Sequence, residues 1–156
     1  MGTVMAETTA NDVANVILAR YRAKRRPISN LELQKLVYYC QAWCIALLNR
    51  TLFADRIEAW VHGPVIPSLY RRFKAFGWNP ITEVPPATQL SPEATGLIDE
   101  VLRAYGKFKP WELERLTHQE APWIRARAGL PPDAESKAEI SVRDMAEYYS
   151  SKAKRA

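Results

Sequence analysis

The sequence predicts a mainly α-helical protein: a single compact domain of five to six helices around a long central helix, with one minor, short β element. Three observations predict this fold. Most segments place apolar residues three or four positions apart, the spacing that lines one face of an α-helix. Several of these segments start at a capping residue or proline and stop at glycine. With 156 residues, 47% of them hydrophobic, the chain can bury a core without metals or disulfides.

The first helix is expected over residues 12–24, with Asn11 as its N-cap and an end in the basic run before Pro27. The longest helix is expected from a capping box, Ser29 to Glu32, to about Asn49. Its predicted apolar stripe is Leu33, Leu36, Val37, Cys40, Trp43, Cys44, Leu47 and Leu48. The stripe leaves Tyr38, Tyr39 and Gln41 off its centre.

The only strand signal lies at residues 57–61, which are rich in aromatic and β-branched residues, with a possible partner near Ile140. Gly63-Pro64 is expected to form the tight turn that follows. Further helices are predicted over 67–76, 92–105, 110–117, 122–127 and 141–151, and residues 78–90 are expected to be a surface connection. The predicted organisation is a flexible N-terminus (1–11), one helical domain (12–151) and a basic tail (152–156).

The formal net charge is +5, from 22 basic and 17 acidic residues. Seven basic residues lie in two short segments: Arg22, Lys24, Arg25, Arg26, Lys152, Lys154 and Arg155. This distribution argues against a nucleic-acid binder, although the first segment keeps that alternative open. The longest unbroken apolar run, residues 44–48, is far below the ~18 residues of a membrane span. We therefore expect a cytoplasmic protein that is neither exported nor inserted, with Cys40 and Cys44 as free thiols.

Two groups of residues could form a metal-binding or catalytic site. Cys40 and Cys44 with His62 and His118 would supply four zinc ligands, but both cysteines lie on the apolar stripe, which favours core packing. His118 with Glu120 could form the acid–base pair of a hydrolase, although residues two apart need not face each other. The sequence contains no nucleotide-binding or hydrolase motif, and only six glycines. No cofactor and no enzymatic activity are expected.

The five tryptophans are a stronger signal. Trp78, Trp111 and Trp123 are expected at helix ends or beside loops, where large amphipathic rings commonly anchor partners. The alternative, equally weighted, is that they close the ends of the helical core. The segment from Trp60 to Val65 could display Trp60 and His62 or simply reverse the chain.

Several ordered motifs support a family resemblance. They are Asp12-Val13-Ala14-Asn15, Leu31-Glu32-Leu33-Gln34-Lys35-Leu36-Val37-Tyr38-Tyr39, Ile57-Glu58-Ala59-Trp60 with Gly63-Pro64-Val65-Ile66-Pro67 and Tyr70, Tyr105-Gly106, Leu116-Thr117-His118-Gln119-Glu120, and Pro122-Trp123. Together they resemble the Panacea domain, the SocA-like and GepA-like antitoxins of bacterial and phage toxin–antitoxin systems. One expected departure is His62, where tyrosine is expected in many relatives, and a second is that we expect no appended DNA-binding or toxin domain.

The resemblance implies an antitoxin that binds and neutralises a cognate protein toxin by occlusion, with an ATP-dependent protease as a second partner if it also delivers the toxin for degradation. It leaves the oligomeric state open. The residues expected to contact a partner are Gln34, Lys35, Tyr38, Trp60, His62, Gly63, Pro64, Val65, Tyr70, Trp111, His118, Glu120 and Trp123.

Overall fold

The computed structural model describes residues 8–155 as one domain of helices around a central helix. The helices are α1 (Ala10–Ala23), α2 (Asn30–Leu48), α3 (Pro67–Phe73), α4 (Pro92–Tyr105), α5 (Pro110–His118), α6 (Ala121–Ala126) and α7 (Val142–Arg155), with a 3₁₀ turn (Lys74–Phe76) and the strands β1 (Glu58–Trp60) and β2 (Gly63–Val65). The predicted fold class is therefore confirmed, with α2 as the central element. None of the helices over 8–155 combines the length and apolar character needed to cross a lipid bilayer.

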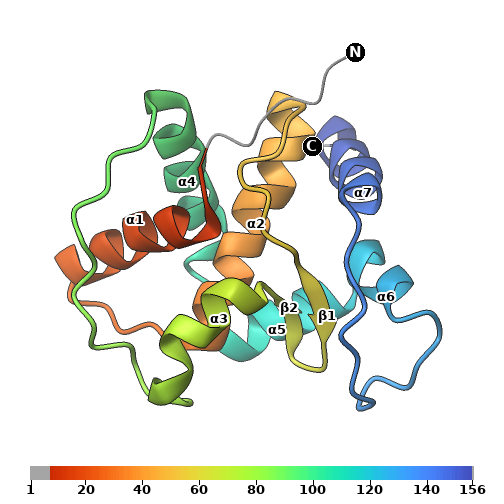
Figure 1. Ribbon diagram of the computed structural model, residues 1–156. Coiled ribbons are helices and arrows are strands. Elements are labelled where there is room, and N and C mark those ends of the chain that lie inside the picture. The colour runs from red at the N-terminus through yellow and green to blue at the C-terminus, as the bar shows by residue number, and fades with distance from the viewer. Residues whose placement is uncertain (1–7, 156) are drawn as a thin grey trace.

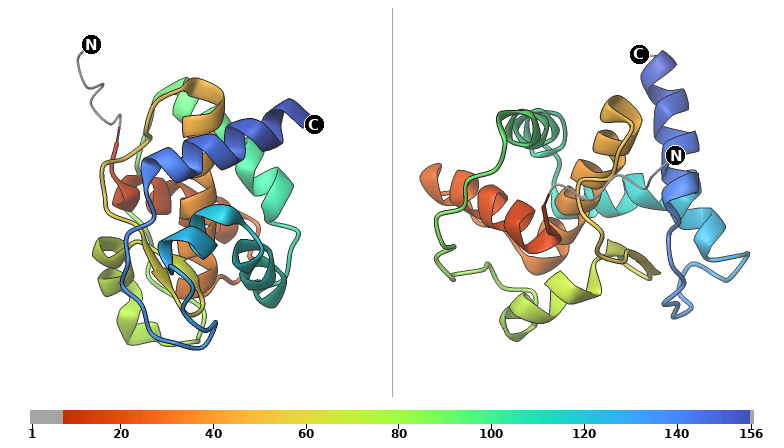
Figure 2. Two further views of the ribbon diagram at one scale, coloured as in Figure 1. Left: turned by 90° about the vertical axis from the view of Figure 1, so that its right-hand side faces the viewer. Right: turned by 45° about the horizontal axis from the view of Figure 1, so that its top comes forward.

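Helix α2 is covered from several directions (Figures 1 and 2). Helices α1 and α4 pack on one side of it and α7 on another, while the β hairpin and α5 pack against its N-terminal half. The single-stripe prediction for this helix was therefore wrong in part. Tyr38, Tyr39 and Gln41 are buried although they were placed off the centre of the stripe, and Leu47, placed on the stripe, is 59% exposed. A one-face pattern cannot describe a helix that has neighbours all around it.

The first and last helices both extend closer to the chain ends than predicted. Thr9, not Asn11, caps α1, and its side chain accepts a hydrogen bond from the Asp12 amide. Residues 1–7 of the predicted flexible N-terminus lie outside the described part of the chain. At the other end, α7 continues past Ser151 to Arg155, so residues 152–155 are helical and only Ala156 of the predicted tail is not described.

The β element is a hairpin whose turn is formed by Val61 and His62. The predicted turn at Gly63-Pro64 was wrong, because these residues form strand β2, in the register Ala59 opposite Pro64 and Trp60 opposite Gly63. The second edge of β1 is partly covered by the segment before α7: Ala59 N donates to Ala138 O over 2.8 Å. The possible pairing of the Ile140 region with this strand is confirmed as an isolated bridge between Glu58 and Glu139.

Candidate partner-binding surface

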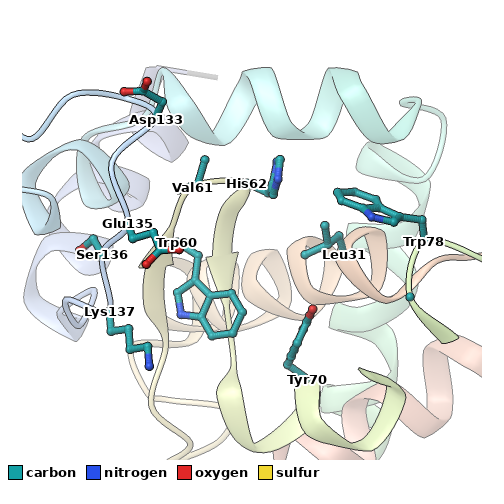
Figure 3. A pocket seen from close by; sticks show the side chains of 11 residues that line it. Leu31, Trp60, Val61, His62, Tyr70, Trp78, Asp133, Glu135, Ser136 and Lys137 are labelled. Atoms are coloured by element: carbon teal, nitrogen blue, oxygen red, sulfur yellow. The ribbon is translucent and has the colours of Figure 1, made fainter. Parts of the chain in front are cut away.

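An open groove of roughly 610 Å³ lies beside the tip of the hairpin (Figure 3). One wall is the loop between α6 and α7, and the other comes from the start of α2, from α3 and from the segment after the 3₁₀ turn. We call it the aromatic groove, and its lining residues are Leu31, Trp60, Val61, His62, Tyr70, Gly77, Trp78, Asp133, Glu135, Ser136 and Lys137. Parts of the sequence as far apart as Leu31 and Lys137 thus meet at one surface.

Aromatic rings form the floor of this groove. The rings of Trp60 and Tyr70 meet edge to face with centroids 4.9 Å apart, and those of His62 and Trp78 do the same at 5.3 Å. Trp78 is 72% exposed, the most exposed of the large apolar side chains over residues 8–155. His62 Nδ1 lies 2.9 Å from Glu114 Oε1, and Trp60 Nε1 donates to Glu58 Oε1 over 2.9 Å. Polar tips are therefore held while ring surface stays uncovered, a feature of binding sites.

The hairpin is fixed from beneath by buried side chains of α5, α6 and the residue that follows. Trp123 Nε1 donates to Trp60 O over 2.8 Å, and Arg127 Nη1 donates to Ala59 O over 3.0 Å. The Arg127 guanidinium lies 4.7 Å from the Trp123 ring centroid, and His118 stacks on the same ring at 4.1 Å. Arg127 also donates to carbonyls of the 131–134 loop. One buried cation thus holds the hairpin and the opposite wall of the aromatic groove in a fixed relation.

The start of α2 holds the other wall. Gln34 Oε1 accepts a hydrogen bond from the Ile66 amide at 3.0 Å, and Gln34 Nε2 donates to Asn30 Oδ1 at 2.9 Å. Asn30 Nδ2 in turn donates to Tyr70 O at 3.2 Å. Both polar side chains are buried, so this relay satisfies backbone groups that the short β2–α3 connection would leave unpaired.

Lys35 is buried directly under the hairpin. Its ammonium donates to Leu31 O over 3.3 Å, and its stem crowds Gly63, where an added Cβ would lie 3.2 Å from Lys35 Cε and 3.0 Å from Thr117 Oγ1. Gly63 has φ +119°, a conformation that side chains other than glycine's resist. Burial lowers the pKa of Lys35 to about 8, an effect that the negative charges of Glu114 and Glu32 only partly oppose.

A second aromatic group lies between α2 and α7, and we call it the tyrosine cluster: Tyr38, Tyr39, Tyr105 and Tyr149. At its centre is Glu120, whose Oε1 accepts hydrogen bonds from Tyr39 Oη at 2.7 Å and Tyr149 Oη at 2.8 Å. Lys152 Nζ lies 3.3 Å from Glu120 Oε2. Burial raises the pKa of Tyr39 and of Tyr149 well above the ordinary value, so both hydroxyls stay protonated donors. This cluster fastens α7 to the core.

The structure places the predicted contact residues at different depths, from the aromatic groove to the interior. Trp60, His62 and Tyr70 line the aromatic groove, and Trp111 is 58% exposed on a separate small pocket on α5. Eight lie in the interior: Gln34, Lys35, Tyr38, Gly63, Pro64, Val65, Glu120 and Trp123. His118 is partly buried against Trp123. The interior residues shape the surface from below.

Sequence reasoning left several lining residues out of the contact set. Trp78 was noticed as a tryptophan beside a loop, but nothing in its neighbourhood distinguished it from Trp123. Asp133 and Glu135 had no signal at all, since they follow a proline-rich stretch and are held near the hairpin by tertiary contacts, those of Arg127 with the loop and the bond from Ala59 N to Ala138 O.

Neither chemical alternative is assembled in the structure. Cys40 and Cys44 are fully buried, so their predicted core packing is confirmed, and within residues 8–155 no cluster of three or more potential metal ligands is found. His118 and Glu120 are not hydrogen-bonded to each other in this part of the chain. Glu120 is occupied by Tyr39, Tyr149 and Lys152. Burial lowers the pKa of His118, which favours its neutral form.

The basic run after α1 lies in another part of the molecule. Arg22, Arg25 and Arg26 line a pocket of roughly 510 Å³ with residues 80–83. The Arg26 guanidinium has a partner within the fold, because it donates a hydrogen bond to Gly106 O. Arg22 and Arg25 remain exposed there, and neither is part of the aromatic groove.

The fold is thus a helical frame that presents an uncovered aromatic groove. The family model described as "Antitoxin SocA-like, Panacea domain" matches residues 33–124, more than half of the chain, so the protein belongs to this family of antitoxins and not to a family of enzymes. The match includes the α2 motif from Leu33 onward, the hairpin, Trp78 and Trp123. The resemblance stated from the motifs is confirmed over this range, while Asp12–Asn15 and the first two residues of the α2 motif, Leu31 and Glu32, lie outside it.

The chain is also similar to Antitoxin SocA of Caulobacter vibrioides (strain NA1000 / CB15N), with 44% identity over 68 residues. That stretch is 44% of this chain and spans 36% of the length of the relative. No solved structure matches the chain.

Proposed function

We propose that this protein is an antitoxin that binds a cognate protein toxin and occludes the toxin's working surface. The observation that carries the proposal is the aromatic groove, in which Trp78 and the partly exposed Trp60 and Tyr70 lie on elements anchored from beneath. Rigid aromatic side chains in a concave surface are the usual centres of tight protein interfaces. Membership in the SocA-like family supports a toxin as the partner.

Occlusion needs area and shape rather than reactive groups. An interface of standard size buries ~1,600 Å² in total, which is more than the aromatic groove itself supplies. The groove would therefore be the centre of a larger contact, with the flanking surfaces of α3, α5 and the α6–α7 loop as its rim. Because the groove walls are fixed by Arg127, Gln34 and Asn30, little conformational entropy is lost on binding.

We further propose that the complex is able to hand the toxin to an ATP-dependent protease in the cytoplasm. The C-terminal turn of α7, Lys152 to Arg155, is the candidate contact, since it lies at the opposite end of the molecule from the β hairpin in Figure 1 and carries three basic residues. The two buried cysteines, which form no disulfide, fit a reducing compartment.

Co-expression with the neighbouring genes tests the proposal. A neighbour that arrests growth alone should be tolerated with this protein, and the two proteins should co-purify. Trp78→Ala should weaken rescue, whereas Leu47→Ala, which truncates an exposed apolar side chain near the C-terminal end of α2 and outside the groove, should preserve it. Rescue that survives loss of the protease gene would establish blocking without degradation. If no neighbour is toxic and none co-purifies, the antitoxin proposal fails.

A further inference from the structure

We propose that the aromatic groove receives an arginine- or lysine-bearing segment of the protein partner, with the cationic side chain held between the aromatic floor and two free carboxylates. The inference rests on the proposed function, since it specifies what part of a toxin the groove takes. It follows from the distribution of charge around the groove, which is opposite in sign to the charge of the whole chain.

The carboxylates of Asp133 and Glu135 are the free negative charges of this groove. Both residues are exposed, both line it, and neither side chain has a hydrogen bond or ion pair within residues 8–155. In Figure 3 they lie on the α6–α7 loop, on the opposite side of Trp60 from Trp78; the Glu135 carboxylate is directed toward Trp60, whereas the Asp133 carboxylate lies farther along the loop and is directed away from Trp60. A cation that binds beside Trp60 therefore meets the Glu135 carboxylate and the ring faces directly, and Asp133 adds negative charge at the edge of the groove.

The other carboxylates near the groove are already paired. Glu58 accepts from Trp60 Nε1 and from Arg56 Nε, while Glu114 faces His62 at 2.9 Å. Lys137, the one lysine among the lining residues, lies on the same loop as Glu135 in Figure 3. The lining therefore carries the two unpaired carboxylates of Asp133 and Glu135 against one ammonium group, a net negative charge.

The floor is chemically suited to the same occupant. A guanidinium or ammonium group is attracted to the face of tryptophan or tyrosine, and the attraction grows as water is excluded. Trp60 and Tyr70 are partly exposed with their edges in contact, and Trp78 is mostly uncovered. An anionic segment would meet the repulsion of Asp133 and Glu135, so the groove selects against acidic partners as well as for basic ones.

The positions of both walls are set before any partner arrives. Arg127 donates to Ala59 O in the hairpin and to Pro131 O in the loop that leads to Asp133. The distance between floor and carboxylates is therefore a property of the folded chain, which favours one kind of occupant.

The test uses indole N–H signals in the NMR spectrum of the full chain, because the five tryptophans report on different places. The probes are three short acetylated, amidated alanine peptides that carry either two arginines, two glutamines or two glutamates. The arginine peptide should shift the Trp60 and Trp78 signals but not those of Trp43 and Trp111, and the other two peptides should leave all of them unchanged. The double variant Asp133→Asn with Glu135→Gln should bind the arginine peptide about fivefold more weakly.

Glu100→Gln is the matched control, because Glu100 is an exposed carboxylate on α4 outside the groove, and it should leave the arginine peptide's affinity unchanged. Equal shifts from the glutamine peptide, no Trp60 or Trp78 shift from the arginine peptide, or unchanged affinity in the double variant would each overturn the inference. These binding results do not depend on the co-expression experiment. If the protein rescues growth but its groove does not bind the arginine peptide, only this inference is wrong. If the groove binds the arginine peptide but no neighbouring gene is toxic, only the antitoxin proposal is wrong.

Discussion

The aromatic groove and the tyrosine cluster use the same kinds of side chain for opposite purposes. In the cluster the rings are covered, Tyr39 stacks on Tyr105 at 4.0 Å, and Tyr39 and Tyr149 share one carboxylate. In the groove the polar tip of Trp60 is bonded to Glu58, but its ring is partly open. Aromatic content therefore does not identify a binding surface. What distinguishes one is ring area that no part of the chain covers, on elements held in place by bonds elsewhere.

The largest effect is expected from the centre of the tyrosine cluster. Glu120→Ala removes the acceptor of two buried hydroxyls and the partner of Lys152, so the free energy of unfolding should fall by about 3–5 kcal/mol. Urea denaturation measures this. Glu147→Ala removes an exposed carboxylate from α7, the helix that carries Tyr149 and Lys152, and should change the free energy of unfolding by less than about 0.5 kcal/mol. Equal losses in the two variants would mean that Glu120 does not fasten α7.

Lys35 gives a pH dependence of known sign. Its pKa falls from 10.5 to about 8 on folding, so between these values the unfolded chain binds a proton that the folded chain has lost. Stability should therefore rise with pH in this window, by up to about 1.4 kcal/mol per unit. Lys35→Met removes the titrating group and keeps the apolar stem. The stability of wild type relative to this variant should increase from pH 8 to pH 10.5, and a constant difference would contradict a depressed pKa.

Gly63 tests whether the hairpin is held as tightly as the contacts indicate. Gly63→Ala forces a side chain into φ +119° and toward Thr117 and Lys35, so it should cost about 2 kcal/mol in a thermal or chemical denaturation. Gly96→Ala, in a helix and facing open space, should instead stabilise by roughly 0.5–1 kcal/mol. A neutral Gly63→Ala would show that the hairpin relaxes readily.

The smallest stability effects compare one hydroxyl from each region. Tyr149→Phe deletes a donor to Glu120 and a partner of Tyr38, and should lower stability by about 1–2 kcal/mol. The Tyr70 hydroxyl has no partner within residues 8–155, so Tyr70→Phe should stay within about 0.5 kcal/mol of wild type. A reversed order would remove the contrast between cluster and groove.

The sequence predicted what depends on local signals. Ser29 and Ser91 cap helices, as their side-chain hydrogen bonds to the Glu32 and Ala94 amides show, and the prolines at 67, 92 and 110 start helices. It could not predict which aromatic residues are covered. Trp123 and Trp78 both lie close to proline, yet Trp123 reaches the Trp60 carbonyl and is buried, while Trp78 finds no acceptor among residues 8–155 and is 72% exposed.

The same limit explains the predicted contact set. Gln34 and Lys35 belong to the most recognisable string of the chain, but they serve as the frame beneath the surface. Asp133 and Glu135 lie in a loop without any motif, and Arg127 and the bond from Ala59 N to Ala138 O hold this loop beside the hairpin. The family motif therefore predicts the residues that build the fold better than it predicts the residues that line the groove.

The central claim is that uncovered groove side chains bind the partner while the frame beneath them only positions them. Trp78→Ala tests it most directly, in a calorimetric titration of purified toxin with the variant and with wild type. Because Trp78 is 72% exposed, its loss should leave the thermal denaturation midpoint unchanged and weaken toxin binding about tenfold or more. Unchanged toxin affinity in a fully folded variant would contradict the claim.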